Sequence, residues 1–322
     1  MSSGIDPGCV RLKIGCAHGR VAVVEVSSER PVVAQALRGR SAEQAVSLVP
    51  LLFALCGKAQ GRAAQLALAA ARGAGCEAHV DPAIEHEALR EHLWRWLLDL
   101  PPLLGAAAMQ SEFVEAMRWL SGGQRAELAV FLAGPRIEEL VWRLREAEDV
   151  GGVGAHLLPA FDARGSLACI ANLDASFCRI PHWQGAAAET GAFARRGYGD
   201  GVAAGALAMR WLSRLAELRE WTAGSPKVGA GGTASAVPVA TGRGRALVET
   251  ARGLLMHEIV LDGDRIAEYF IVAPTEWNFH PGGPLAGWLH GRDAGDRDAL
   301  EKFAARAVAA LDPCVRWEME WL

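Results

Sequence analysis

Two β-hairpin patterns, separated by a long stretch of mainly helical pattern, restrict the fold of this chain more than any other feature. In the first, over residues 9–27, Val10, Leu12 and Ile14 alternate with polar neighbours before the chain turns and returns. In the second, residues 252–261 and 265–273 flank Asp262-Gly263-Asp264, which is a strong turn sequence. A mostly helical chain with two separate hairpins predicts an α+β fold, with a central helix bundle and small β-hairpins.

The helical stretch carries clear start signals. Ser41-Ala-Glu-Gln44 is a capping box that opens a helix continuing to Cys56, and an alanine-rich helix follows over about 60–72. Asp81-Pro82 begins another helix, which we expect Pro101-Pro102 to end. Further helices are expected between residues 109 and 148, over 201–221 and over about 296–310. Residues 223–244 are rich in Gly, Ser, Thr and Pro, so they predict a long loop. We expect one domain over 1–322.

The composition excludes several classes of protein. The 322 residues are 51% hydrophobic and 22% charged, which suits a globular chain with a buried core rather than a disordered one. The net charge of −4 lacks the basic excess of a nucleic-acid-binding domain. The N-terminus lacks the pattern of a signal peptide, and the longest apolar run, Val46–Cys56, is too short to span a bilayer. We therefore expect a cytoplasmic protein that neither enters a membrane nor binds nucleic acid.

Several patterns that suggest chemistry are weak. His86 and His92 are six residues apart, whereas the zinc-protease motif needs a spacing of four. Cys76-Glu-Ala-His79 offers two metal ligands without a partner pair at zinc-site spacing. Lys227 precedes the glycines that follow it, which is the reverse of a phosphate-binding loop. A surface or core role is the simpler interpretation of each.

Two of the seven cysteines lie at positions that suggest metal binding more strongly than the patterns above. Cys56 lies between two expected helices, at the opening of the second, where unpaired amides and the helix dipole lower the pKa of a thiol and favour a metal-binding thiolate. Cys314 follows the last expected helix in the sequence Asp312-Pro313-Cys314. Taken alone, each cysteine is more often structural; in a reducing compartment all seven should be thiols.

The order of motifs between these cysteines is that of a known family. Thr250-Ala251-Arg252-Gly253 leads into a strand with a histidine, and Ala273-Pro274-Thr275-Glu276-Trp277-Asn278 follows. This order resembles the large subunit of nickel–iron hydrogenases, which has a Cys-Gly-x-Cys pair near its N-terminus and an Asp-Pro-Cys-x-x-Cys-x-x-His end. The resemblance covers both ends of the chain and residues 189–285. It implies a fold similar to a truncated hydrogenase large subunit.

The departures from that family point away from hydrogen turnover. The second cysteine of the first motif is replaced by Ala59, and the last motif has Trp317 and Glu320 in place of its second cysteine and its histidine. The enzymes hold nickel and iron with four thiolates, and this chain retains two of them. Nickel, which prefers several soft thiolate ligands in such a site, would be underligated. We therefore expect no nickel and no enzyme activity.

The chain is instead similar to hydrogenase accessory proteins of the HoxV/HupK type, which are non-catalytic relatives of the large subunit. This resemblance implies a scaffold that carries the Fe(CN)2CO fragment during assembly of the active site. The metal ligands would be Cys56 and Cys314, and Arg252, Pro274 and Thr275 would bind the fragment where the family places its cyanides. The implied partners are maturation chaperones of the HypC/HypD type and the large-subunit precursor.

Other interpretations remain open at this stage. The protein could be a metal-free interaction protein, a chaperone for the large subunit, in which Cys56 and Cys314 are relics. An active hydrogenase subunit is a further alternative, which the missing thiolates disfavour. Both surviving cysteines match positions that bind only nickel in the enzymes, so the iron fragment would lie displaced or rest on one thiolate at a time. Cys76 or Cys178 could also join the site.

Overall fold

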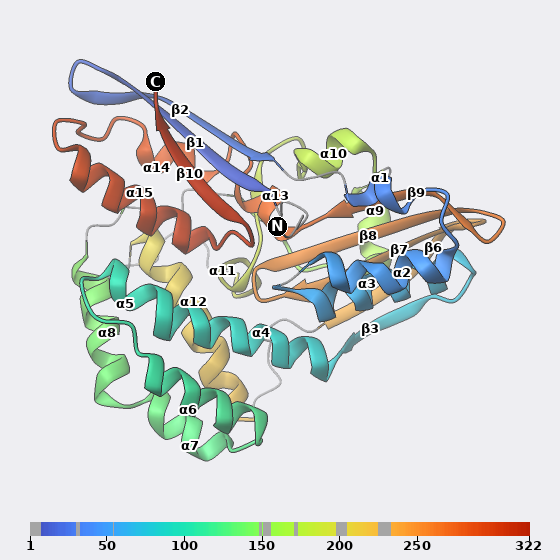
Figure 1. Ribbon diagram of the computed structural model, residues 1–322, viewed down its shortest axis with the longest axis horizontal. Coiled ribbons are helices and arrows are strands. Elements are labelled where there is room, and N and C mark those ends of the chain that lie inside the picture. Colours follow the sequence, from blue (N-terminus) through green and yellow to red (C-terminus); the bar gives the residue numbers. More distant parts are fainter. Residues whose placement is uncertain are drawn as a thin grey trace, which may run out of the picture.

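The computed structural model describes residues 8–29, 33–53, 55–147, 150, 156–170, 173–197, 205–224 and 233–322. Figure 1 shows a group of helices at the lower left, a five-stranded sheet at the right and a three-stranded sheet at the top. The predicted α+β class is confirmed, although the second hairpin belongs to a sheet larger than the sequence indicated.

The predicted N-terminal hairpin is confirmed, and it gains a third strand from the C-terminus. β1 (Cys9–Ala17) and β2 (Arg20–Glu29) are antiparallel and joined by a two-residue turn. β10 (Arg316–Trp321) lies parallel to β1, with Val10 opposite Trp317. The sequence did not predict β10, because its pairing partner is at the other end of the chain. Figure 1 shows β10 beside β1, so the two ends of the chain form one sheet.

The five-stranded sheet corrects the predicted loop. The sheet has the order β3-β6-β7-β8-β9, and the confirmed second hairpin forms its last two strands. Residues 233–244, expected within a loop, form β6 and the start of β7; residues 225–232 lie outside the described part of the chain. The small residues that suggested a loop pack beneath a helix instead. The strands are β3 (Cys76–Val80), β6 (Thr233–Ala240), β7 (Arg243–Thr250), β8 (Gly253–Asp262) and β9 (Arg265–Val272), and a separate pair is β4 (His156–Leu157) with β5 (Ala188–Glu189).

The predicted helices are confirmed with one correction. Pro101 and Pro102 do not end the helix, because a π-helical turn leads into a further short helix that holds both prolines in its first turn, where they are tolerated. The longer helices are α2 (Ala42–Leu52), α3 (Gly57–Ala71), α4 (Pro82–Trp94), α6 (Gln110–Ser121), α7 (Arg125–Leu132), α8 (Pro135–Glu146), α12 (Ala206–Thr222) and α15 (Arg297–Leu311). The expected start of α12, residues 201–204, lies outside the described ranges.

Short helices connect these elements. They are α1 (Val33–Leu37), the π-helical turn η1 (Arg95–Asp99), α5 (Leu100–Leu103), α9 (Ala163–Cys169), α10 (Ala175–Arg179), α11 (Ala192–Arg195), α13 (Pro274–Asn278) and α14 (Pro284–Leu289). The helical group and the three-stranded sheet share one apolar core, which contains Trp96, Trp211 and Phe303. The five-stranded sheet is covered by separate apolar clusters.

The alanine-rich helix α3 packs directly on the five-stranded sheet. Its buried alanines share a core with residues of β6, β7 and β8. Gly244 on β7 lies beneath the helix, and a side chain at this position would overlap the backbone nitrogen of Ala71 and the carbonyl oxygen of Ala67. The helix can approach the strand this closely only because both carry small side chains where they meet. Because Cys56 is the N-cap residue of α3, this packing also fixes one end of the candidate site.

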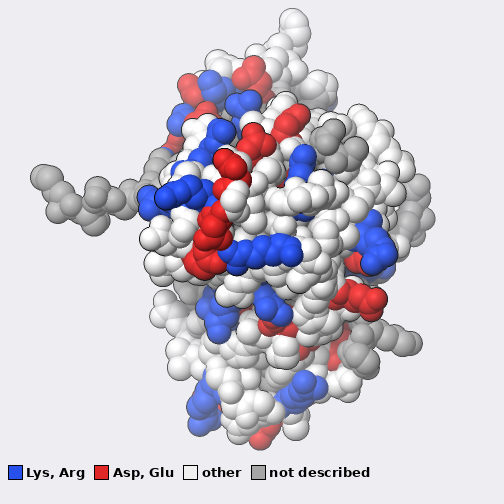
Figure 2. Space-filling view, turned by 90° about the vertical axis from the view of Figure 1, so that its right-hand side faces the viewer, with Lys and Arg blue, Asp and Glu red and all other residues white. Residues whose placement is uncertain are grey.

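The surface of the protein carries charges of both signs. On the face shown in Figure 2, Lys and Arg side chains lie beside Asp and Glu side chains, and neither sign forms a separate large patch. Arg72, for example, bridges Glu43 at 2.5 Å and Asp264 at 2.6 Å. Within the described ranges, none of the helices combines the length and apolar character needed to cross a bilayer.

The contact between α3 and the sheet generates a first prediction. Gly244→Ala should lower the free energy of unfolding by about 3 kcal/mol, because the added methyl group forces the helix away from β7. Gly287→Ala is the matched control, since its Cβ would meet nothing within 4 Å inside α14, and it should leave stability unchanged or raise it slightly. Urea unfolding of both variants measures the difference, and equal stabilities would contradict this packing.

Candidate functional site

Cys314 and Thr275 are brought into contact by the end of α15 and the start of α13. The hydroxyl oxygen of Thr275 accepts a hydrogen bond from the amide of Cys314 at 3.3 Å, and it lies 3.1 Å from the sulfur of Cys314. Thr275 is buried, and Pro274 sets the first turn of α13 before it. The structure therefore places these three predicted site residues together, with the threonine hydroxyl engaged by the cysteine.

Cys56 is the N-cap residue of α3, as its position between two helices indicated. Its side chain makes no capping hydrogen bond. The amides of Lys58 and Ala59 donate instead to the carboxylate of Glu87, at 2.9 and 3.1 Å. The expectation that unpaired amides would act on the Cys56 thiol is wrong in this respect, because a carboxylate from α4 occupies two of them. Burial raises the pKa of Glu87, while these amides and Arg90 lower it.

Arg252 interacts electrostatically with both cysteines. It occupies the turn between β7 and β8, and its guanidinium is buried. Burial alone would lower its pKa, but Asp312 and Glu91, followed by the thiols of Cys314 and Cys56, raise it well above the usual range. One buried guanidinium is thus within electrostatic reach of both sulfur atoms, which come from opposite ends of the chain.

Two of the three guanidinium nitrogens of Arg252 are engaged. Nε donates to Asp312 at 3.2 Å, and one terminal nitrogen, Nη2, donates to Glu91 at 3.0 Å. The other terminal nitrogen, Nη1, makes no hydrogen bond to the described residues. Arg252 is therefore held at two nitrogens, and its Nη1 group can donate to a further group.

Asp312 is the centre of the buried charges beneath the site. It ends α15 in a left-handed conformation, with φ of 57°. Its carboxylate is 2.7 Å from Nε of Arg95, 3.2 Å from Nε of Arg252 and 3.9 Å from Nε of Arg214. Burial opposes ionisation, but Arg252, Arg95 and Arg214 hold the pKa of Asp312 far below its usual range. Three arginines from separate elements thereby fix the residue two positions before Cys314.

The buried charges extend away from Asp312 through paired groups. Glu217 lies 2.7 Å from His92 and 2.9 Å from Arg195, which also contacts Glu249 at 2.8 Å. Burial alone would raise the pKa of Glu217, but Arg195 and His92 lower it to about 2. The buried carboxylate of Glu217 therefore has cationic partners on α4 and α11, which offset the cost of burying its charge.

Asn278 is a site residue that the sequence motif contained but that we did not select. Its amide nitrogen donates to the carbonyl oxygens of Arg252 and Leu311, each at 3.3 Å, and its oxygen accepts from the amide of Thr190 at 2.9 Å. It therefore ties the arginine-bearing turn to the segment that carries Cys314. Its place in the motif Ala273–Asn278 could have indicated this role, because a buried Asn usually has several hydrogen-bond partners.

The positions where the enzymes have further ligands are used differently here. Ala59 is fully buried in the core between α3 and the sheet. Trp317 and Glu320 belong to β10, where Glu320 lies 3.6 Å from Lys13 of the neighbouring strand. Across the described ranges, no group of three or more His, Cys, Asp or Glu side chains is arranged to hold a metal ion.

The other two cysteines considered earlier have separate environments. Cys76 lies 3.4 Å from Nδ1 of His79, on the edge strand β3. Cys178 packs in the apolar cluster on the other face of the sheet, and burial raises the pKa of its thiol to about 12. None of the seven cysteines forms a disulfide, and neither Cys76 nor Cys178 contributes to the electrostatic environment of Arg252.

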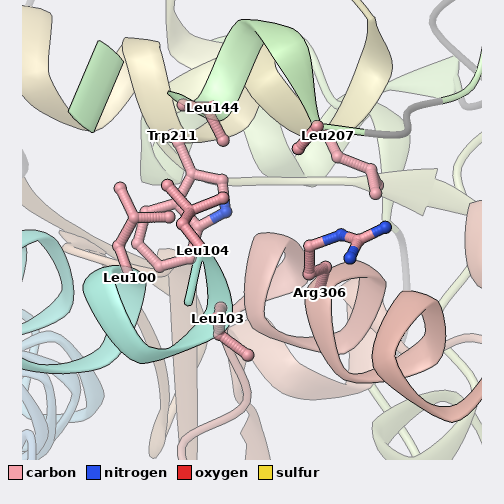
Figure 3. A pocket seen from close by; sticks show the side chains of 8 residues that line it. Leu100, Leu103, Leu104, Leu144, Leu207, Trp211 and Arg306 are labelled. Atoms are coloured by element: carbon pink, nitrogen blue, oxygen red, sulfur yellow. The ribbon is translucent and has the colours of Figure 1, made fainter. Parts of the chain in front are cut away.

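The described part of the chain contains small cavities, two of which have room for about one water molecule each. One, of about 10 Å³, is lined by Arg252, Arg214, Asn278 and neighbouring residues. The other, also of about 10 Å³, is lined mainly by leucines around Trp211, and Figure 3 shows Arg306 at its side. No thiol lines either cavity, so a group bound by the cysteines would lie outside both.

The chain is similar to proteins connected with nickel-dependent hydrogenases. Residues 203–316 match the family described as nickel-dependent hydrogenase. The chain is 33% identical to the hydrogenase expression/formation protein HoxV of Cupriavidus necator, over 92% of each chain. It is 32% identical to the hydrogenase expression/formation protein HupK of Azotobacter vinelandii, over 97% of this chain and 98% of the relative.

Solved structures show the same fold at low identity. A [NiFeSe] hydrogenase from Desulfovibrio vulgaris Hildenborough superposes with a TM-score of 0.66 at 16% identity, over 93% of this chain and 94% of the other. The enzyme from Desulfomicrobium baculatum gives a TM-score of 0.59 at 15% identity, over 94% and 95%. The predicted likeness of the fold to a hydrogenase large subunit is therefore confirmed.

The cluster around Asp312 generates a second prediction. Asp312→Asn should lower the free energy of unfolding by about 3–5 kcal/mol at pH 7, because it leaves buried arginines without their counter-charge. The lowered pKa of Asp312 means that this stabilisation is complete above the unfolded-state pKa of about 3.9 and is lost as the pH falls below it. The stability difference between wild type and variant should therefore be constant from pH 7 to about 5 and shrink below about 4.

Asp298→Asn is the control for this experiment. Asp298 pairs with Lys302 at 3.7 Å on the surface, where both side chains are exposed, so its loss should change stability by less than about 0.5 kcal/mol. Chemical denaturation at several pH values measures both variants. Equal effects of the two substitutions at pH 7 would refute the role assigned to Asp312.

Proposed function

Because the chain belongs to the family of hydrogenase expression/formation proteins that includes HoxV and HupK, we propose that it carries the Fe(CN)2CO fragment during assembly of the nickel–iron active site. The observation that carries this proposal is that Arg252, a buried guanidinium held by Asp312 and Glu91, interacts electrostatically with both Cys56 and Cys314. The names of the relatives support a role in hydrogenase maturation, and the chemistry of the site supports this particular cargo.

The side chains near Cys56 and Cys314 include the types of donor that an iron centre with three diatomic ligands uses. Such a centre needs few further donors, and two cysteine thiolates supply soft ones. Its cyanides carry negative charge and accept hydrogen bonds, and the remaining donor of Arg252, Nη1, is suited to one of them. Thr275 acts through Cys314, because its hydroxyl lies against that sulfur, and Pro274 shapes the turn that presents it.

The missing ligands make the cargo removable. An alanine and a β-strand occupy the positions where the enzymes have their other thiolates, so two sulfur ligands rather than four hold the fragment. A carrier must release its cargo, whereas an enzyme must retain it. We therefore propose a non-enzymatic, nickel-free protein that receives the fragment from chaperones of the HypC/HypD type and passes it toward the large-subunit precursor in the cytoplasm.

One observation favours a second candidate, a metal-free chaperone for the large subunit. Thr275 already binds the backbone of Cys314, and Glu87 already binds the amides beside Cys56, so both cysteine segments are held without a metal. In that case Cys56 and Cys314 would be structural. The two candidates differ in whether the thiols are needed for maturation.

Infrared spectroscopy separates the two candidates. We expect cyanide and carbonyl stretching bands in wild-type protein purified from cells that contain the maturation machinery. Cys56→Ser and Cys314→Ser should each lose most of the band intensity, because each removes one of two ligands. Cys169→Ser is the matched control, since Cys169 is an exposed thiol on α9, and it should keep the bands.

Thermal unfolding of each variant establishes that it is folded. Bands of unchanged intensity in both folded site variants would contradict thiolate binding of the cargo. Absence of the bands from wild type, together with full hydrogenase maturation by both site variants, would favour the metal-free chaperone instead.

A further inference from the structure

A row of buried polar side chains leads from the sheet to Cys56. The hydroxyl of Tyr269 on β9 lies 2.8 Å from Nδ1 of His257 on β8. The other ring nitrogen, Nε2, lies 2.8 Å from the amide oxygen of Gln60 on α3, and the amide nitrogen of Gln60 lies 3.7 Å from the sulfur of Cys56. We call Tyr269, His257 and Gln60 the buried relay.

The direction of the hydrogen bonds in the buried relay follows from the neutral ring of His257 and the orientation of the Gln60 amide. His257 has no solvent exposure, and burial lowers its pKa to about 3, so the ring is neutral and carries one N–H. Burial also raises the pKa of Tyr269, which keeps its hydroxyl proton. With the amide of Gln60 oriented as in the structure, Nε2–H donates to its oxygen, and the Tyr269 hydroxyl donates to Nδ1.

The orientation of Gln60 determines which of its groups faces the sulfur of Cys56. Once its oxygen is occupied by His257, Gln60 can present only its NH2 group to the sulfur. A hydrogen bond to a metal-bound thiolate fixes its orientation and lowers its electron donation to the metal. We propose that the buried relay makes Gln60 a positioning residue, which holds the Cys56 sulfur as a hydrogen-bond acceptor and tunes it as a ligand; this inference deepens the proposed function and rests on it.

The surroundings of the buried relay argue against a purely structural role. Its three side chains lie within or beside the apolar cluster between α3 and the sheet, where alanine and aliphatic residues fill the other positions. Aliphatic side chains would fill that space without the desolvation that buried polar groups require. Each group of the relay is also satisfied by the next one, and the last donor of the row points to a cysteine.

The apo protein provides the first test, which is independent of any cargo. Nitrogen-15 NMR of the His257 ring should show the proton on Nε2 and none on Nδ1. The reverse tautomer would turn the Gln60 oxygen toward Cys56 and would overturn the inference. Since this measurement needs no iron, its failure is distinguishable from failure of the proposed function.

The loaded protein provides the second test. In Gln60→Leu the carbonyl stretching band should move to lower frequency, because the thiolate donates more electron density once the hydrogen bond is removed. Gln65→Leu is the matched control, since Gln65 is exposed on the same helix, and its band should stay at the wild-type position. Tyr269→Phe removes only the hydroxyl group at the end of the relay farthest from Cys56. It should shift the carbonyl band in the same direction by a smaller amount.

Other outcomes overturn the inference. A folded Gln60→Leu protein that retains its cargo with an unmoved carbonyl band, or with a band at higher frequency, would contradict the assigned role of Gln60. If the wild type shows no bands at all, the proposed function fails, and the tautomer of His257 alone then decides whether the buried relay has the stated orientation.

Discussion

The arrangement of the site depends on one buried carboxylate, that of Asp312. Arg95, Arg214 and Arg252 reach it from three separate elements, and its own residue ends α15 immediately before the segment that carries Cys314. Since an unpaired buried charge is costly, these four side chains must come together whenever the chain folds. The helical group, the turn between β7 and β8 and the C-terminal segment are thereby locked to one another.

Short motifs in the sequence selected residues that lie in contact in the fold. Thr275 and Cys314 come from separate segments, and the hydroxyl oxygen of Thr275 lies 3.1 Å from the sulfur of Cys314. Arg252 interacts electrostatically with Cys314 and Cys56. Local signals also predicted both hairpins and most helix starts, because caps and turn residues act within a few positions of themselves. Those signals are independent of distant partners.

What the sequence could not predict depends on such partners. Residues 233–244 resemble a loop by composition, yet most of them belong to strands. Their small side chains leave the space that α3 needs to pack on the sheet. β10 exists because it pairs with β1 from the other end of the chain. Glu87 belonged to no motif, and His257 appeared in one only as a histidine within a strand. Their roles near Cys56 come from contacts that α4 and β8 make across the fold.

The central claim is that two sulfurs from opposite ends of the chain share one iron centre beside Arg252. Iron K-edge X-ray absorption of the loaded protein tests it most directly, because the fine structure counts the sulfur neighbours of the metal. We predict two sulfur ligands together with the light atoms of the cyanides and carbonyl, and one sulfur ligand after either cysteine is replaced. An iron centre without sulfur, or one whose sulfur count is the same in both variants and in wild type, would contradict the account.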